Sequence, residues 1–323
     1  MRSSLRSPRR VPPGLAIVGL GLLWGAAFPA IDAVVSEIPP LTAAAIRYAV
    51  SGCIVLAYAA ATTDRLVPRS RRELLGIAVV GSFVFGGYQA GLYLGTQYVS
   101  GAVASVVATM APVLAALVAV PILGESRGLL DLGGFVLGVA GVVVIAQPAP
   151  GSGSLSTTGL GVGLVFLGVA MFAIGSVSVQ LFDEGLPTES LQGWAMLVGA
   201  SLLVAGAVVR GESPPSLVSV SPVALGSLVY VTLVAGAGGY LLYFRLVSHV
   251  GATETTLVSY IEPLSATLVA VALFGEPVRA TTVAGFLAVA AGFAIVSRET
   301  MRALVGSPGR GAEGQAVSSN RGN

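Results

Sequence analysis

The sequence predicts an all-α polytopic membrane protein, and three observations support this fold class. Hydrophobic residues make up 54% of the 323 residues and charged residues only 10%, whereas soluble domains carry roughly 25% charged residues. The mean hydropathy is +0.88. The apolar residues gather into ten long stretches, and the fourth and fifth of them match the ninth and tenth in sequence, while the earlier ones match more weakly. Soluble enzymes are nearly excluded, because a globule of this size needs more polar surface.

Each apolar stretch approaches the roughly 20 residues that a helix needs to cross the hydrocarbon core of a bilayer. The stretches cover residues 14–34, 41–61, 74–96, 100–123, 129–147, 159–181, 190–209, 222–246, 252–274 and 281–297. We expect helices in spite of the many glycines, because a backbone in lipid must pair its own polar groups. Long unbroken runs without alternation disfavour a β-barrel.

The segments outside the spans are polar and predict the orientation of the chain. Residues 1–13 form a basic tail, 148–158 a flexible linker and 298–323 a second tail without apolar content. Arginines gather on the side of the N-terminus: Arg2, Arg6, Arg9, Arg10, Arg65, Arg69, Arg71 and Arg72. The positive-inside rule therefore predicts a plasma-membrane protein with both termini in the cytoplasm.

The two halves of the chain repeat each other without a gap over a long stretch. Pro112 and Pro263 are 151 residues apart, and the same offset pairs Gly124-Glu125 with Gly275-Glu276 and Gly134-Phe135 with Gly285-Phe286. We therefore predict two repeats of five helices, at residues 14–147 and 159–297. An odd number of spans makes the second repeat enter the membrane from the opposite side, an arrangement that is typical of secondary transporters.

The repeated tracts APVLAALVAVPILGE and EPLSATLVAVALFGE, together with GLLWGAAFP and IRYAVSG, resemble the EamA family of the drug/metabolite transporter superfamily. The resemblance covers residues 14–297. It implies a secondary transporter that moves a small metabolite by alternating access, in the first place an exporter of an amino acid or a related drug-like solute. An uptake carrier or exchanger of the same fold stays open. The chain contains no lysine, which disfavours the phosphate-carrying branches of the superfamily.

Glu262 is the first candidate for the transport site. It lies about ten residues into the ninth span, beside Pro263, and Ser259 shares its helix face. A charge at a helix centre costs roughly 2.5–3.5 kcal/mol on insertion scales, so it faces the bundle interior or a wet cavity. Glu262 could carry a proton during transport. The alternative is a protonated, hydrogen-bonded residue that only fixes the packing of its helix.

Arg47 is the second candidate, about two turns into the second span. A lone buried arginine is costly, so we expect a partner, and Asp32 near the outer end of the first span could pair with it. The pair could bind substrate or act as a gate near the outer mouth. A structural ion pair, or an arginine that reaches the membrane interface, is the alternative.

Further polar and aromatic residues of the spans are candidates for the cavity lining. Gln89 and Tyr93 share one face of the third span, and Tyr240 matches Gln89 at the 151-residue offset, with Tyr243 close by. Trp24 lies in mid-span, where no interfacial belt is expected, and could form an aromatic wall. Hydrogen bonding and packing between helices are the alternative roles.

The prolines Pro112 and Pro263 lie near the middles of the fourth and ninth spans, where a proline kinks a helix. The kinks could serve gating of the site, or they could only shape the bundle. We weigh the two roles equally.

Other function classes find little support. The chain has one histidine and one cysteine, so neither a catalytic triad nor a metal cluster can be assembled, and we predict no enzyme and no cofactor. The sequence has no phosphate-binding loop for nucleotides and, outside the tails, no clustered basic face for nucleic acids. The expected partners are a small-molecule substrate and the lipid bilayer, with the chain a monomer or homodimer. A membrane sensor or scaffold is a weaker alternative. Cys53 is expected to be buried.

Overall fold

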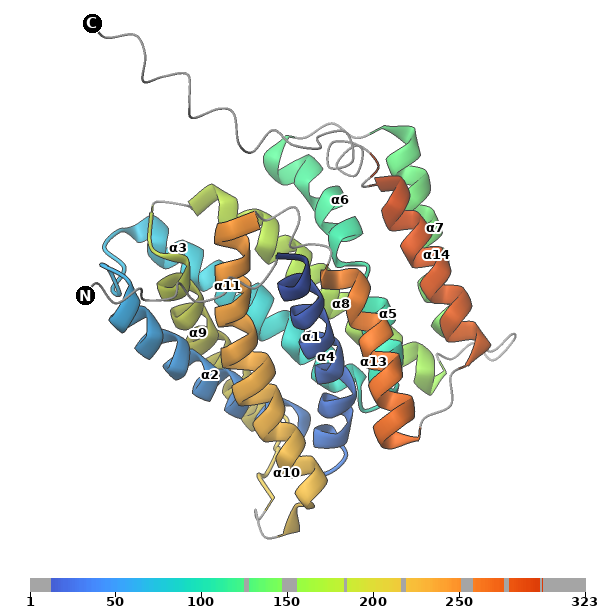
Figure 1. The fold of residues 1–323 in the computed structure, drawn as a ribbon, viewed down its shortest axis with the longest axis horizontal. Helices are drawn as coiled ribbons and strands as arrows, with labels where there is room; N and C mark the ends of the chain where they lie inside the picture. The colour runs from blue at the N-terminus through green and yellow to red at the C-terminus, as the bar shows by residue number, and fades with distance from the viewer. Residues whose placement is uncertain are drawn as a thin grey trace, which may run out of the picture.

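The computed structural model describes residues 13–124, 128–146, 156–182, 185–215, 219–250, 258–275, 279–296 and 298. Within these ranges every regular element is helical, which confirms the all-α class (Figure 1). The two predicted tails and the linker 148–158 lie almost wholly outside the described residues.

The elements of the first half begin near the N-terminus and end before the linker. They are α1 (Pro13–Val35), α2 (Pro40–Thr62), α3 (Arg71–Val79), the π-helical η1 (Val80–Tyr88), α4 (Gln89–Gly95), α5 (Gly101–Ala108), α6 (Ala111–Leu123) and α7 (Leu129–Ala146). The second half holds α8 (Thr157–Ser178), the 3-10 turn η2 (Val179–Phe182), α9 (Thr188–Val209), α10 (Pro222–Val229), the π-helical η4 (Tyr230–Gly238), α11 (Gly239–Val250), α13 (Val258–Phe274) and α14 (Ala280–Val296).

Seven helical segments among the described residues are long and apolar enough to cross a membrane. They are Gly14–Val35, Pro40–Thr62, Arg71–Gly95, Gly101–Leu123, Thr157–Phe182, Thr188–Val209 and Pro222–Tyr243. Three further apolar helices are shorter: Leu130–Ala146, Ile261–Phe274 and Ala280–Val296. The chain is therefore a multi-pass membrane protein. The number of ten spans stays a prediction, because the three short helices fall below the usual length of a span.

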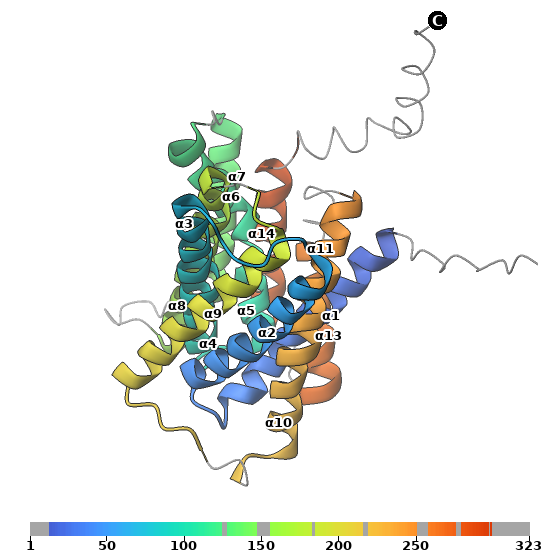
Figure 2. The same ribbon diagram turned by 90° about the vertical axis from the view of Figure 1, so that its left-hand side faces the viewer.

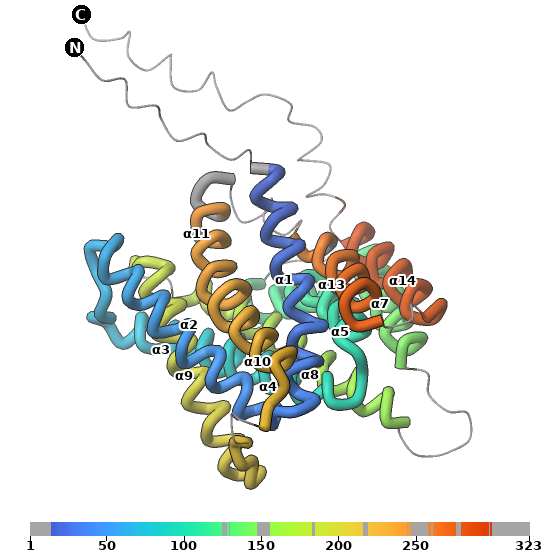
Figure 3. The backbone as a smooth tube through the Cα atoms, turned by 60° about the horizontal axis from the view of Figure 1, so that its bottom comes forward, coloured from blue at the N-terminus to red at the C-terminus, as the bar shows by residue number. Residues whose placement is uncertain are grey.

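The packing of the helices is the same when the two halves are exchanged. Helix α2 packs on its counterpart α9, and α7 packs on its counterpart α14. Helix α1 packs on α13, and its counterpart α8 packs on α5 and α6. Figure 2 shows α2 and α9 side by side, and Figure 3 shows α1 between α11 and α13. This reciprocal pattern is what two repeats related by a pseudo-two-fold axis produce.

Helices α7 and α14 pack on each other at one edge of the bundle (Figure 1). The glycines in this contact follow the same pseudo-two-fold relation. A Cβ atom on Gly134 would lie 2.6 Å from the carbonyl oxygen of Gly292, and one on Gly141 would lie 2.7 Å from that of Gly285. At the 151-residue offset Gly134 corresponds to Gly285, and Gly141 to Gly292. The two helices are therefore antiparallel, and small residues let their backbones meet.

The glycines of the repeated Gly-Glu motif end the corresponding helices α6 and α13. Gly124 has a φ of 69° and Gly275 a φ of 67°, a left-handed conformation that closes a helix and that glycine adopts without steric cost. Their neighbours Glu125 and Glu276 lie outside the described residues.

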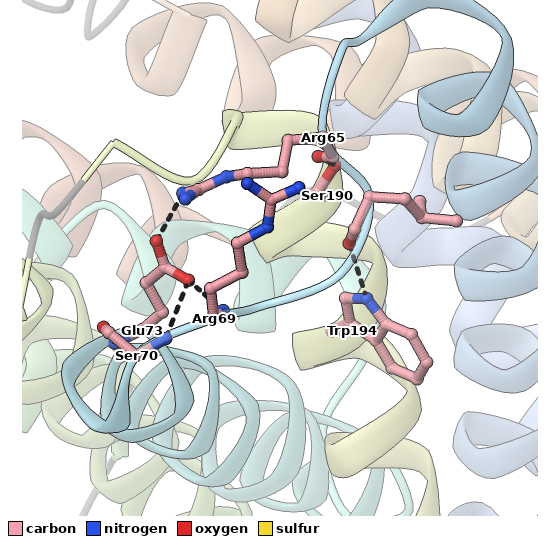
Figure 4. Close-up of polar contacts among 7 residues, drawn as sticks. Arg65, Arg69, Ser70, Glu73, Ser190 and Trp194 are labelled. Carbon is pink, nitrogen blue, oxygen red and sulfur yellow. Dashed lines mark hydrogen bonds and ion pairs between the residues drawn. The ribbon is translucent and has the colours of Figure 1, made fainter.

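At the end of the bundle where α2 ends, the connection to α3 is tied to α9 (Figure 4). Ser70 caps α3, and the carboxylate of Glu73 completes the capping box and accepts a hydrogen bond from the guanidinium of Arg65. The indole nitrogen of Trp194 donates to the carbonyl oxygen of Leu66 at 3.0 Å. These contacts join α2, α3 and α9 at this end.

At the opposite end, two carboxylates join the halves. Glu212, which follows α9, accepts hydrogen bonds from the backbone nitrogens of Leu41 at 3.3 Å and Thr42 at 2.8 Å, in the first turn of α2. Glu37, between α1 and α2, accepts from the backbone nitrogen of Ser221 at 2.7 Å and from its hydroxyl at 2.5 Å. A carboxylate at the start of a helix is stabilised by the free N–H groups there and by the positive end of the helix dipole.

Cys53 departs from its expected position. The side chain is exposed on the outer face of α2, where a hydrophobic residue can face lipid instead of the core. The sequence of an apolar membrane helix therefore does not by itself tell which of its residues face lipid and which are buried.

Candidate functional site

A cavity of about 460 Å³ lies between the two halves, in the size range of small-molecule sites. Its walls come from α1, α2, η1, α4, α5 and α6 of the first half and from α8, η2, α9, α11 and α13 of the second. Most of the residues singled out in the sequence line it, namely Trp24, Arg47, Gln89, Pro112, Tyr240, Tyr243, Ser259 and Glu262. Tyr93, Asp32 and Pro263 are not part of its lining.

Two π-helical segments lie beside this cavity at corresponding positions of the repeats. The segments η1 and η4 begin 150 residues apart and have nine residues each. Tyr88 ends η1 and Gln89 follows it, while Tyr240 lies just after η4, and all three side chains line the cavity. The hydroxyl of Ser51 in α2 donates to the carbonyl oxygen of Thr232 in η4 at 2.8 Å. Isolated π-helical turns are rare and often mark functional sites.

Arg47 is buried on the cavity wall, with 5% of its surface exposed. One guanidinium nitrogen donates to the hydroxyl of Tyr93 at 3.4 Å. The guanidinium carbon lies 4.9 Å from the ring centroid of Tyr48, a cation–π distance. The Nε atom is buried and has no hydrogen-bond partner. Tyr93 is fully buried behind Arg47, so it supports the guanidinium without facing the cavity.

The predicted ion pair of Arg47 with Asp32 does not form, and that prediction is wrong. The carboxylate of Asp32 accepts a hydrogen bond of 3.2 Å from the backbone nitrogen of Gly101, at the start of α5. No salt bridge joins Arg47 to an acidic residue within the part of the chain that the structure describes. The start of α5 competes for the carboxylate because it offers unpaired N–H groups, which the sequence pattern did not reveal.

Glu262 and Ser259 line the cavity from α13, which is held tightly to α1. The hydroxyl of Ser265 donates to the carbonyl oxygen of Leu22 at 2.7 Å. Glu262 is half-buried, and among the described residues it takes part in no salt bridge. The cavity therefore contains one acidic and one basic side chain that do not neutralise each other by direct contact.

Aromatic rings form a wall of the cavity around Trp24. The ring centroids of Trp24 and Tyr240 are 5.4 Å apart, and those of Trp24 and Tyr243 are 5.5 Å apart. The indole nitrogen of Trp24 donates to the carbonyl oxygen of Ala235, inside η4, at 3.0 Å. Trp24 thus joins α1 to the π-helical segment of the other half.

The two prolines have different surroundings although they correspond in sequence. Pro112 lies in the first turn of α6, just after the break that separates α5 from α6, and it lines the cavity. Proline removes no helical hydrogen bond at this position. Pro263 lies inside the continuous helix α13 and is buried. A gating role of these prolines stays a prediction.

Several lining residues were missed in the sequence. Tyr48, Phe172 and Gln192 line the cavity, and the amide oxygen of Gln192 is buried without a hydrogen-bond partner. Gln192 could have been found by the criterion that selected Gln89, an amide inside an apolar span. Phe172 has no such signal, because aromatic residues in an apolar run are usually core residues.

Comparison with known proteins decides the family. The model of the EamA-like transporter family matches residues 13–147 and again residues 159–298. The chain belongs to this family. Its members are transporters, so this EamA family member is a multi-pass membrane transporter rather than a protein of an enzyme family.

Several relatives cover most of this EamA family member. The uncharacterized inner membrane transporter YedA of Escherichia coli K12 is 28% identical over 81% of this chain and 82% of its own. A protein of Streptantibioticus cattleyicolor, named a probable terminal-alkyne amino-acid exporter, is 30% identical over 91% of this chain and 97% of its own. The chain spans only 60% of a WAT1-related chloroplast protein of Arabidopsis thaliana. A solved crystal structure shares the fold, with a TM-score of 0.61 and 20% identity over 90% of this chain and 98% of the other.

Proposed function

We propose that this transporter exports a small metabolite from the cytoplasm by alternating access to the central cavity, and that Glu262 carries the coupled proton. The observation that carries the proposal is the cavity itself. It lies between the two repeats, where rocking of one repeat against the other would move it from one membrane side to the other. The two charged side chains among its described lining residues come from different halves, Arg47 from α2 and Glu262 from α13.

The depth of the lining residues supports an access path from the cytoplasm. Val258 begins α13 and Gln192 lies in the second turn of α9, and both line the cavity. In the predicted orientation these helices begin at the cytoplasmic face. At the opposite end, Glu212 and Glu37 bind the starts of α2 and α10 beyond the cavity. This arrangement fits a carrier that is closed toward the outside and loads its substrate from within.

The direction of transport is supported by one relative, which is named an amino-acid exporter. Uptake or exchange on the same scaffold would use the same cavity, so the assay must read direction directly.

The test is a transport assay with purified full-length protein in liposomes loaded with a mixed metabolite extract. Loss of solutes is followed by mass spectrometry with and without a proton gradient, and protein-free liposomes give the passive leak. The variants are Glu262→Gln and, as a matched control, Asp64→Asn, whose carboxylate is exposed in the α2–α3 connection. We expect selective loss of one solute class, accelerated by the gradient in wild type and Asp64→Asn and at least about tenfold slower in Glu262→Gln.

Two results would contradict parts of the proposal. Selective transport that responds neither to the gradient nor to Glu262→Gln would reject proton coupling through this residue and retain the transporter. If the protein stays folded and only accumulates solutes supplied from outside, the direction is uptake and the export proposal fails.

A further inference from the structure

We infer that Arg47 binds a carboxylate of the transported solute, so that the cavity selects organic monocarboxylates with an apolar or aromatic body. This inference rests on the proposed function, because it names the substrate class of that same cavity. Among the described residues, no salt bridge balances the charge of Arg47 on the cavity wall. An arginine side chain stays protonated in proteins, so the positive charge of Arg47 is permanent.

The structure argues against the two alternative roles of Arg47, a structural ion pair and a side chain that reaches the membrane interface. An internal ion pair is absent among the described residues, since Asp32 binds the start of α5 instead. A side chain that reaches the membrane interface would be exposed, whereas Arg47 is 5% exposed and lines an internal cavity. The contacts that remain are a long hydrogen bond to Tyr93 and the ring face of Tyr48. Both orient the guanidinium, and neither supplies a negative charge.

Unused hydrogen-bonding capacity lies at the same wall. The Nε–H group of Arg47 is a buried donor without a partner. The amide oxygen of Gln89, a side chain with 3% exposure, is a buried acceptor without a partner, so it suits a donor group of the solute and not its carboxylate. Buried polar groups in native proteins are nearly always paired, so the unpaired Nε–H donor of Arg47 favours a bound acceptor at this wall. A guanidinium binds a carboxylate through two parallel N–H donors, and this geometry suits a planar anion.

The charges of the cavity favour one carboxylate over a phosphate. Among the described residues of the lining, Arg47 is the only basic one, and Glu262 lines the same space. A phosphate dianion would leave one charge without compensation and would face a second acidic group. The remaining wall is largely apolar. It includes aromatic rings, with Trp24 and Tyr240 at 5.4 Å between ring centroids, so an apolar body completes the expected solute.

The test compares acids with amides of the same shape. The probes are 3-phenylpropionate and phenylalanine, their two amides, and phenyl phosphate. Full-length protein is studied by thermal stabilisation in detergent and by transport in liposomes, with protein-free liposomes to subtract passive leak of the amides. We expect each acid to bind and to leave the liposomes at least about tenfold better than its amide. Phenyl phosphate should neither bind nor move.

Variants of Arg47 test whether this residue causes the preference for acids over amides. Arg47→Gln should remove the difference between acid and amide, and Arg47→Lys should retain part of it, because lysine keeps the charge but loses the paired donors. Arg71→Gln is the matched control, since Arg71 is exposed at the start of α3 and should behave as wild type. If Arg47→Gln does not fold, the comparison of acid with amide in the wild type still decides the question.

The two readouts separate this inference from the transport proposal. Binding that prefers acids without any transport would support the carboxylate site and reject the transport function. Three results would overturn the inference. The amides could bind and move as well as the acids, phenyl phosphate could bind or move better than the acids, or folded Arg47→Gln could keep the preference for acids. Absence of any stabilisation or transport by the two acids would also overturn it.

Discussion

The backbone of α1 at Gly25 lies directly against the backbone of α13 at Glu262. A Cβ atom on Gly25 would lie 2.5 Å from the Cβ of Ser265 and closer still to the carbonyl oxygen of Glu262. No rotation of a side chain can relieve a contact with a backbone atom. This glycine therefore sets how closely the helix with Glu262 approaches Trp24, the residue before Gly25 in the sequence and a part of the same cavity.

The variant Gly25→Ala should push α13 away from α1. We expect a loss of apparent stability in detergent of about 1–3 kcal/mol, the usual range for overpacking, together with a severalfold lower transport rate. The measurement is the apparent melting temperature followed by the liposome assay. Gly19→Ala is the matched control on the same helix, because a Cβ on Gly19 meets nothing within 4 Å. Equal behaviour of the two variants would contradict the role of close packing at Gly25.

A second glycine pair tests the pseudo-two-fold contact of the halves. In Gly292→Ala the new methyl group would meet the carbonyl oxygen of Gly134 across the α7–α14 contact, so we expect a destabilisation of about 1–3 kcal/mol. Gly133→Ala, one residue from Gly134, points into open space and should be neutral or slightly stabilising through helix propensity. Thermal unfolding in detergent compares the two. If Gly133→Ala were the more damaging variant, the packing register of α7 on α14 would be wrong.

Trp24→Phe tests the link between α1 and η4. The substitution keeps an aromatic ring but removes the indole donor to Ala235, which should cost about 1 kcal/mol of stability. Transport should fall severalfold, because the lost bond holds α1, which lines the cavity, against η4 of the other half. Trp194→Phe is the matched control, since it removes a bond of the same length, 3.0 Å, to Leu66 outside the cavity. It should lower stability similarly and leave the transport rate unchanged. A similar loss of transport in both variants would show that stability alone explains the effect.

The fold could be predicted from the sequence because its signals are repetitive. Apolar runs of membrane length and matches at one offset, such as Gly134 with Gly285, depend on many residues at once. The site could be predicted only in part. Glu262 and Arg47 were found because a charge in an apolar span is costly wherever it points. Their partners were not found, because whether Asp32 meets Arg47 or the start of α5 depends on a contact between distant helices.

The contact of Glu37 with Ser221 should make the end of the bundle sensitive to acid. Hydrogen bonds from the hydroxyl and then the backbone of Ser221 hold the pKa of Glu37 below its ordinary value of 4.5. Because the folded state has the lower pKa, the stabilisation is complete above about pH 4.5 and is lost as the pH falls through the lowered value. Wild type should therefore lose more apparent melting temperature between pH 6 and pH 3 than Glu37→Gln does.

The control for this pH dependence is Asp64→Asn, which removes an exposed carboxylate at the other end of the bundle and should retain the acid response of the wild type. Ser221→Ala should reduce the acid response as Glu37→Gln does, because the serine hydroxyl is the main cause of the lowered pKa. It should also cost about 1 kcal/mol at neutral pH, since Ser221 caps α10. An acid response of Glu37→Gln equal to that of the wild type would show that other carboxylates dominate the loss of stability and that this contact does not hold the two halves together.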